Sequence, residues 1–243
     1  MPLRIGLQMC SRYSLTSPVE AVRAYFRVAR DHDFPPRYNI APTQPVAIVR
    51  TGADNKRELA LVRWGLIPGW AKDPATFTTI LNARAETVLE KASFKGAMRH
   101  RRCLVPADAF YEWVGKPGAK RPFIVSRAGP AGLLAFAGLW EHWMGADGSE
   151  LESMAIVTVA ANRTISAIHD RMPAIMHEAG FDAWLDTRNV RDHEVYEWLK
   201  PAPEDLLQIE ELLPAINSSR REGADLQTRV SPHRGVGGAG TLL

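Results

Sequence analysis

Six short segments of the chain combine ionisable groups with aromatic and turn-forming residues, the mixture from which reactive sites are built. These segments are Met9–Tyr13, Tyr38–Thr43, Arg63–Trp70, Asn82–Thr87, Val105–Trp113 and His169–Pro173. Together they supply a thiol, Cys10, a carboxyl group, Glu112, and an imidazole, His169, besides an amide and several guanidinium groups. A thiolate can attack an electrophilic carbon, while a carboxyl group or an imidazole carries the protons that such a reaction moves.

Each segment also has a purely structural interpretation, which the residues alone leave open. A tryptophan beside glycine and proline packs at a chain corner more often than it stacks on a base. Glu112 could be a strand carboxylate facing solvent, His169 could belong to a turn, and Cys10 could be an inert thiol. The joint occurrence of a nucleophile and two proton carriers in one chain favours the chemical interpretation.

Several common catalytic patterns are missing from the sequence. It has no His-Glu-x-x-His and no Cys-x-x-Cys pattern, so we predict no metal site and no cofactor. A phosphate-binding Gly-x-x-x-x-Gly-Lys loop and a Gly-x-Ser-x-Gly elbow are also missing. The second cysteine, Cys103, stands in an apolar, strand-like run, which predicts a buried small side chain. One disulfide between the two cysteines is conceivable, but two cysteines are not a disulfide framework.

The composition permits a globular protein that binds nucleic acid without establishing that it does. The 243 residues are 46% hydrophobic and 23% charged, with a formal net charge of +3. This balance can form a sizeable core and keep the chain in solution, and it is mildly favourable for contact with an anionic partner. We find no apolar run of membrane-spanning length and no secretory signal in residues 1–18. We therefore expect a cytoplasmic protein with no membrane association.

The elements that must position these groups can be read from the periodicity. Ser17 to Glu20 resembles a capping box with Pro18 at the first helical position, and apolar residues at helical spacing predict a helix over 18–30. Short β-rich runs predict strands at Val46–Val49, Leu59–Trp64, Phe123–Ser126, Leu133–Trp140 and Met154–Ala160. Further helices are predicted at Glu86–Met98, Phe181–Leu185 and Asp192–Leu199. Strands outnumber helices without βαβ alternation, which predicts one α+β domain around a curved, mostly antiparallel sheet or open barrel with flanking helices.

The C-terminal end differs from the body of the chain. Few residues are apolar from about Arg220 onward, and the stretch from Gly235 to Gly240 is rich in glycine. This composition predicts a mobile end, and we place the flexible tail at 231–243.

The six segments resemble the SRAP family, the SOS response-associated peptidase or abasic-site processing proteins. The matching motifs are Met-Cys-x-Arg-Tyr, Tyr-Asn-Ile-Ala-Pro-Thr, Arg-Trp-Gly-Leu-Ile-Pro-x-Trp, Asn-Ala-Arg-x-Glu-Thr, Arg-Cys-Leu-Val-Pro-Ala-Asp-x-Phe-Tyr-Glu-Trp and His-Asp-Arg-Met-Pro. They occur in order from Met9 to about Leu226, so the resemblance implies a single compact SRAP-type domain over 10–230. Ala109 stands where the family usually has glycine, a change that we expect to be silent.

The resemblance implies a role for each matching residue. Cys10 would be the nucleophile that bonds to an abasic site in single-stranded DNA. The protein would be a monomer and would associate with the nucleoid when it is bound to DNA. Asn82 would be its polar neighbour. We expect the Glu112 carboxyl group to lie in an apolar setting between Tyr111 and Trp113, where a raised pKa would let it serve as acid and base in turn. His169 would share this proton transfer.

The residues expected to contact DNA are Arg12, Asn39, Pro42, Trp70 and Arg84. The stretch between Trp70 and Asn82 is longer here than in some members of the family. The resemblance therefore implies these DNA contacts less directly than it implies the catalytic roles.

An abasic site is a masked aldehyde, and a chain that begins with cysteine offers it two nucleophiles. The α-amine would form a Schiff base, and the thiol would close it into a thiazolidine, with weak lyase and self-cleaving peptidase activity as accompanying reactions. Two alternatives stay open at the level of sequence: a cysteine-type peptidase with incidental DNA binding, and a non-enzymatic module that binds single-stranded DNA.

The first nine residues depart from the family pattern, in which Cys directly follows the initiator Met. Here Met9 precedes Cys10, and the nitrogen of Cys10 is an amide as long as residues 1–9 remain attached. We expect this extension to be absent from the mature protein, either because translation starts at Met9 or because the protein cuts itself before Cys10. The sequence favours the first explanation, since an in-frame Met directly before Cys would otherwise be a coincidence.

Overall fold

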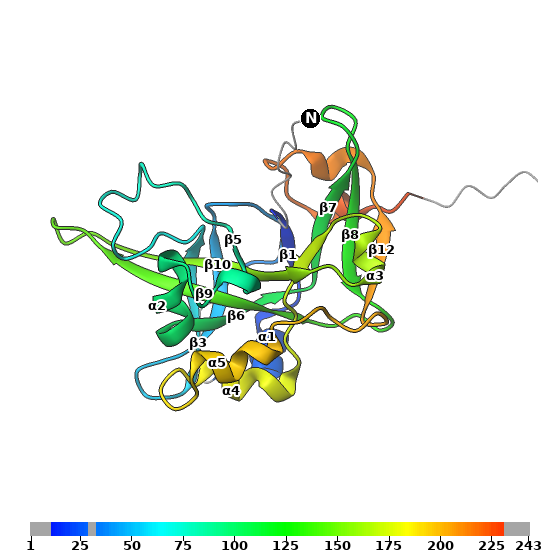
Figure 1. The fold of residues 1–243 in the computed structure, drawn as a ribbon. Coiled ribbons are helices and arrows are strands. Elements are labelled where there is room, and N and C mark those ends of the chain that lie inside the picture. The colour runs from blue at the N-terminus through cyan, green and yellow to red at the C-terminus, as the bar shows by residue number, and fades with distance from the viewer. Residues whose placement is uncertain (1–10, 29–32, 231–243) are drawn as a thin grey trace, which may run out of the picture.

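Two β-sheets form the frame of the molecule, and the computed structural model describes them within residues 11–28 and 33–230 (Figure 1). The first sheet has five strands in the order β12-β8-β7-β1-β2, and neighbouring strands are antiparallel. Its strands are β1 (Tyr13–Leu15), β2 (Arg37–Ile40), β7 (Ala109–Val114), β8 (Arg121–Arg127) and β12 (Leu207–Glu211).

The second sheet curves until it closes on itself. Its strands follow the order β11-β10-β4-β3-β6-β9, and the further pairing of β9 with β10 closes five of them into a barrel. The strands are β3 (Pro45–Thr51), β4 (Arg57–Trp64), β5 (Asn82–Arg84), β6 (Arg102–Ala107), β9 (Leu134–Met144), β10 (Glu150–Ala160) and β11 (Arg171–Pro173). Only the pairings of β10 with β4 and β5 are parallel among those described. The predicted α+β fold around a curved, mostly antiparallel sheet or barrel is thus confirmed.

Short helices flank this frame. The α-helices are α1 (Val19–Phe26), α2 (Ala92–His100), α3 (Arg163–Ser166), α4 (Phe181–Leu185) and α5 (Asp192–Val195). The 3-10 helices are η1 (Ala85–Thr87), η2 (Glu178–Gly180), η3 (Tyr196–Trp198), η4 (Pro214–Asn217) and η5 (Ala224–Gln227). All five predicted strands are present, and the helix predicted at Phe181–Leu185 has those bounds. The one predicted at Asp192–Leu199 is split into α5 and η3.

The start of α1 differs from the predicted capping box. The N-cap is Pro18, without a side-chain cap, because the Ser17 hydroxyl donates instead to Asp108 Oδ1 at 2.6 Å. The Asp108 carboxylate also accepts the backbone N–H of Ser17 at 2.8 Å. A residue that follows β6 therefore fixes the entry to α1, and the helix ends early at Arg27, whose φ of 53° is left-handed. Of the predicted helical residues, 29–30 lie outside the described part of the chain.

A second correction concerns the helix predicted at Glu86–Met98. The structure has η1, then a turn, and then α2 from Ala92, because Lys91 is extended with ψ of 131°. Glu86 is held by an ion pair with Arg171, while Val88 is fully buried. These two tertiary contacts fix the start of the segment near the second sheet, where a continuous helix was expected.

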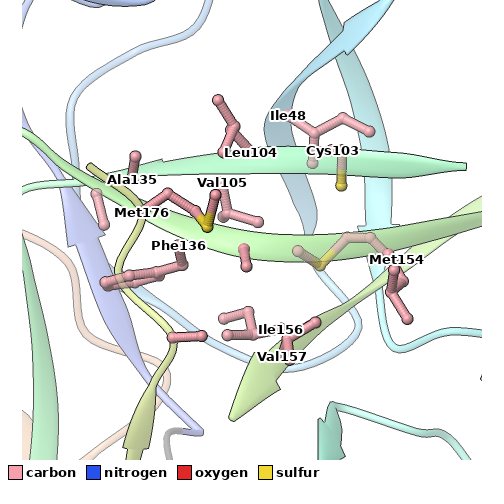
Figure 2. Packing of buried hydrophobic residues seen from close by; sticks show 14 of the residues in the cluster. Ile48, Cys103, Leu104, Val105, Ala135, Phe136, Met154, Ile156, Val157 and Met176 are labelled. Atoms are coloured by element: carbon pink, nitrogen blue, oxygen red, sulfur yellow. The ribbon is translucent and has the colours of Figure 1, made fainter. Parts of the chain in front are cut away.

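Apolar side chains fill the barrel and join it to the helices. Figure 2 shows Val105, Phe136 and Ile156 among the buried residues from neighbouring strands of the barrel. Cys103 belongs to the same cluster with no exposed surface, which confirms its prediction as a buried side chain, and its burial raises the pKa of the thiol. A thiol in this position is protonated and inert at neutral pH.

Part of the segment after Arg220 packs against the first sheet, although its composition is poor in apolar residues. Leu226 is fully buried, and the side chain of Gln227 donates to the Tyr111 hydroxyl at 2.8 Å. Leu226 and Gln227 thus contact the side of β7 that carries Tyr111, whereas most of residues 220–230 are exposed. The mobility predicted for this segment stays a prediction. The tail predicted at 231–243 lies outside the described residues.

Candidate active site and DNA-binding surface

Glu112 is a buried carboxyl group on the inner face of β7. Side chains alternate between the two faces of a strand, so Glu112 shares its face with Phe110. The ring of Phe110 packs edge-on against Phe136 of the barrel, with centroids 6.0 Å apart, and Glu112 is 4% exposed. Tyr111 and Trp113 belong to the cluster on the opposite face. The expected setting between these two aromatic neighbours is therefore wrong, because the apolar surroundings come from the inner face of the sheet.

The strand β1 brings the start of the described chain to Glu112. Tyr13 pairs with Phe110 in an antiparallel register, and Arg12 O accepts the backbone N–H of Tyr111 at 3.0 Å. Continuing this register by one residue sets Ser11 opposite Glu112. Cys10, the predicted nucleophile, lies outside the described residues.

Arg12 and Asn39 form a buried pair on the outer face of this sheet. The guanidinium of Arg12 donates to Asn39 Oδ1 and to Ile216 O, the latter at 3.4 Å, and lies over the Trp113 ring at 5.4 Å. Burial lowers the pKa of Arg12. The Asn39 side chain donates to two further backbone carbonyls, including Arg221 O at 2.7 Å. The predicted DNA contacts of Arg12 and Asn39 stay predictions, and their present partners belong to the protein.

Asn82 and Arg84 lie on β5, beside the middle of β10. Asn82 pairs with Ile156, and the exposed Arg84 pairs with Thr158. The carbonyl before Asn82, Leu81 O, accepts the indole N–H of Trp64 at 3.1 Å. Trp64 in turn packs edge-on against Tyr13 of β1, with ring centroids 5.2 Å apart. Two contacts thus link the Asn82 backbone to β1, which pairs with the strand β7 that carries Glu112.

His169 precedes β11, and its ring is largely buried. Its Nδ1 accepts the backbone N–H of Arg171 at 3.0 Å, which assigns the proton of the neutral ring to Nε2. Nδ1 also lies 3.0 Å from the carboxylate of Asp170, a contact that becomes favourable only on protonation. Burial is the largest effect on the ring and lowers the pKa of His169, while Asp170 opposes this shift. The neutral ring thus has a proton to donate from Nε2.

Arg171 is a cation near this site to which the sequence comparison gave no role. Its guanidinium binds both oxygens of Glu86 and donates to Thr158 O at 2.6 Å. Because Thr158 is the residue paired with Arg84, two guanidinium-bearing residues flank one position of β10. The ion pair with Arg171 lowers the pKa of Glu86. The signal was present in the sequence, since Arg171 stands two residues after His169 in the same motif.

Trp70 and Pro42 occupy two other parts of the surface. Trp70 is 60% exposed in the loop between β4 and β5 and meets Phe77 edge-on at 5.6 Å, so one face of its ring is available for stacking. Pro42 is half-buried beside Asn39 at a hollow next to β2. Trp70 and Pro42 thus lie apart from Asn82, Arg84 and His169, which are near β10 through the pairings of β5 and β11 with that strand.

No group of three or more potential metal ligands occurs within the described ranges. The helices in the same part of the chain are all too short or too polar to cross a membrane.

The chain belongs to the SRAP family. The model of this family, described as SOS response associated peptidase, matches residues 9–219, and thereby the segments that carry Asn82, Glu112 and His169. Among solved structures, a protein from Bacteroides thetaiotaomicron has the same fold, with a TM-score of 0.78 over 91% of this chain and all of that one, at 24% identity. One from Bordetella bronchiseptica has a TM-score of 0.72 and 28% identity over 84% of this chain.

Two relatives carry names that state an activity. The abasic site processing protein YoqW of Bacillus subtilis is 34% identical over 223 residues, which cover 90% of this chain and 98% of the relative. The abasic site processing protein HMCES of Gallus gallus is 35% identical over 204 residues, which cover 71% of this chain and 60% of the relative.

Proposed function

We propose that this protein processes abasic sites in single-stranded DNA by capturing the ring-opened sugar covalently with Cys10. The names of the relatives support the substrate class. The observation that carries the proposal is Glu112: a carboxyl group, 4% exposed, on the strand whose partner leads directly to Cys10. A buried carboxyl group can hold or release a proton beside a reacting sugar without competition from bulk water.

The capture consumes one aldehyde, one amine and one thiol and releases one water. The α-amine of Cys10 adds to the aldehyde carbon, and loss of water gives a Schiff base. The thiol then adds across the C=N bond, with sulfur on carbon and the proton on nitrogen, which closes a five-membered thiazolidine. Ring closure by sulfur suppresses elimination of the 3′ phosphate, so we propose at most weak lyase activity.

The other site residues would serve the steps before closure. Glu112 would accept the proton of the sugar hydroxyl and help to deliver one to the ring oxygen, and the Nε2–H of His169 is a second donor for this opening. The Asn82 amide would orient the sugar. Arg84 would neutralise a phosphate, and the exposed Trp70 would stack on a base, which together hold a single strand without reading its sequence.

Cys10 can react in this way only as the first residue. The match of the family model begins at Met9, which supports a mature chain that starts at Cys10 after removal of Met9. The competing route is self-cleavage before Cys10, which would give the protein a peptidase activity. Intact mass of the protein from its own host distinguishes them: we expect a Cys10 terminus in wild type and in Glu112→Ala, whereas loss of processing in Glu112→Ala would indicate self-cleavage.

The first prediction tests the chemistry with an abasic single-stranded oligonucleotide. Wild type should give an adduct that survives heat on a denaturing gel and whose mass is that of protein plus oligonucleotide minus one water. Cys10→Ala should give no such adduct, and Glu112→Gln should form it more slowly by about 100-fold, the usual effect of losing a general acid or base.

Cys103→Ala is the matched control, because it removes the other thiol of the chain from a fully buried position. It should form the adduct as wild type does. A heat-stable adduct in Cys10→Ala would contradict the thiazolidine, and wild-type rates in Glu112→Gln would remove its role as acid and base.

A further inference from the structure

A basic hollow lies at the edge of the five-stranded sheet, outside the group of residues assigned to the reaction. It has a volume of about 630 Å³ and opens between the turn that follows β2 and the segment at 219–222. The charged residues of its lining are Arg37, Arg220, Arg221 and Glu222. Three arginines against one glutamate leave this lining with a formal charge of plus two.

The single carboxylate of the hollow is already engaged by the protein. Glu222 accepts the backbone N–H of Tyr38 and lies 3.4 Å from Arg37 Nε, so it joins the C-terminal segment to β2. Arg221 pairs with Asp225. Arg220 is exposed, and no ion pair of its side chain is found within the described residues. The hollow therefore presents at least one guanidinium whose charge the protein does not balance.

The chemistry of the lining selects the class of ligand. Thr43, Gln44 and Ser219 add neutral hydrogen-bonding groups, and the lining contains no aromatic side chain on which a base could stack. Guanidinium groups bind phosphate oxygens in a two-pronged geometry, and they hold their charge at every physiological pH. This combination suits the phosphates of a nucleic-acid backbone better than a base or an apolar ligand.

The hollow is tied to the proposed reaction site through a single side chain. Asn39 lines the hollow, and its Oδ1 accepts a hydrogen bond from Arg12. Arg12 directly follows Ser11, the residue that lies opposite Glu112. The adjacent turn is fixed to the barrel, since Thr43 N donates to Trp64 O at 2.8 Å. A strand held in the hollow would thus keep a defined position relative to both sheets.

We propose that this hollow binds the backbone phosphates of the DNA strand that flanks the abasic nucleotide, with Arg220 as its principal contact. The inference rests on the proposed function for the identity of its ligand. Its experiment uses undamaged single-stranded DNA, so that binding is measured without the covalent step, and failure of one proposal does not imply failure of the other.

The test compares Arg220→Glu with Arg188→Glu in the full chain. Both arginines are exposed, but Arg188 lies beside Thr51, at the opposite end of β3 from the hollow. The dissociation constant is measured by fluorescence anisotropy over a range of salt concentrations. For each phosphate that the protein no longer neutralises, the slope of log K against log salt should become shallower by about 0.7, the value for single strands. We expect this in Arg220→Glu, a smaller change in Arg220→Gln, and none in Arg188→Glu.

Oligonucleotides that are lengthened one nucleotide at a time locate the phosphates that Arg220 binds. The difference between Arg220→Glu and wild type should appear only beyond a threshold length, because a short strand cannot span the site and the hollow together. Equal slopes in wild type and Arg220→Glu would overturn the inference, and so would a difference that is already complete with the shortest strand that binds. An acidic peptide that binds the hollow while DNA binding is unaffected by Arg220→Glu would assign it to a protein partner instead.

Discussion

The protonation of His169 links the chemistry of one residue to the stability of the fold. Burial lowers its pKa in the folded protein, so the unfolded chain, whose histidine has a pKa of about 6.5, binds more protons as the pH falls. The stability that the neutral ring contributes is therefore present above about pH 6.5 and is lost as the pH falls towards the folded value. Asp170 and Arg171, the charged neighbours, act in opposite directions on this shift.

We accordingly expect His169→Gln to weaken the pH dependence of the free energy of unfolding between about pH 5 and pH 7, the range in which histidine titrates. Urea denaturation at a series of pH values measures it. His193→Gln is the matched control, because that ring is 63% exposed. An identical pH dependence in wild type and His169→Gln would show that the ring does not titrate differently in the folded state.

At the scale of residues, the sequence indicates candidate side chains but not their surroundings. Glu112 and His169 could be named from motifs, because residue type and order along the chain carry that information. Strand alternation places Glu112 on the opposite face of β7 from Tyr111 and Trp113. The expectation that these two residues surround Glu112 did not take this alternation into account. The partners of Asn39 come from 218 and 221, and no local pattern indicates contacts so distant in the sequence.

Among the elements, the ends of two helices depend on one buried cation. Arg102 of β6 is 1% exposed and donates to four backbone carbonyls at 2.6 to 2.9 Å, those of Met98, Trp184, Asp186 and Val190. Carbonyls at helix C-termini carry partial negative charge, which favours a cation at this position. Burial is the largest effect on the guanidinium and lowers the pKa of Arg102 to about 10, so it remains charged at neutral pH.

Replacing this cation should destabilise the protein strongly. Arg102→Met keeps a long side chain but leaves several buried carbonyls without their donor, which should reduce the free energy of unfolding by about 3 kcal/mol or more. Arg102→Lys has a point charge in place of the planar group, so its free energy of unfolding should lie between those of Arg102→Met and wild type. The midpoint of urea denaturation measures both. Arg99→Met on the exposed side of α2 is the control, and an equal loss in that variant would argue against a special role for Arg102.

Element prediction succeeded where local pattern and tertiary environment agree. The strand at Leu59–Trp64 and the helix at Phe181–Leu185 have apolar spacing that matches the surfaces they bury. It failed where a distant side chain decides the local conformation, as Asp108 does at the start of α1. The strand Tyr13–Leu15 is only three residues long, too short for any period to reveal it, and it is stabilised by pairing with β2 and β7.

At the scale of the whole molecule, the proposed site is divided between the two sheets. It can work only if the two sheets keep a fixed position relative to each other. Glu112 belongs to the five-stranded sheet, whereas Asn82 and Arg84 lie beside the barrel strand β10. Trp64 joins them, since its ring packs against Tyr13 and its indole N–H is bonded to Leu81 O. A change at Trp64 should consequently disturb the geometry of capture as well as the stability.

Trp64→Phe keeps an aromatic ring, removes the indole N–H, and leaves a small void. We expect a loss of about 1 to 3 kcal/mol of stability from the hydrogen bond and the packing together. The rate of adduct formation with abasic DNA should fall as well, because Asn82 and Glu112 are no longer held in register, while affinity for undamaged single strands stays near wild type. Single-turnover reactions that are stopped at a series of times and resolved on denaturing gels give the rate of adduct formation. Fluorescence anisotropy gives the affinity for undamaged single strands.

Trp184→Phe separates the loss of register from a general loss of stability. Trp184 is also fully buried and donates its indole N–H to a backbone carbonyl, Cys103 O at 2.8 Å, but it lies on α4, away from the junction of the two sheets. It should lose comparable stability and still capture at the wild-type rate, measured at a temperature where both variants are folded. Equal slowing of capture in the two variants would mean that lower stability alone explains the effect, and that Trp64 does not align the two halves of the site.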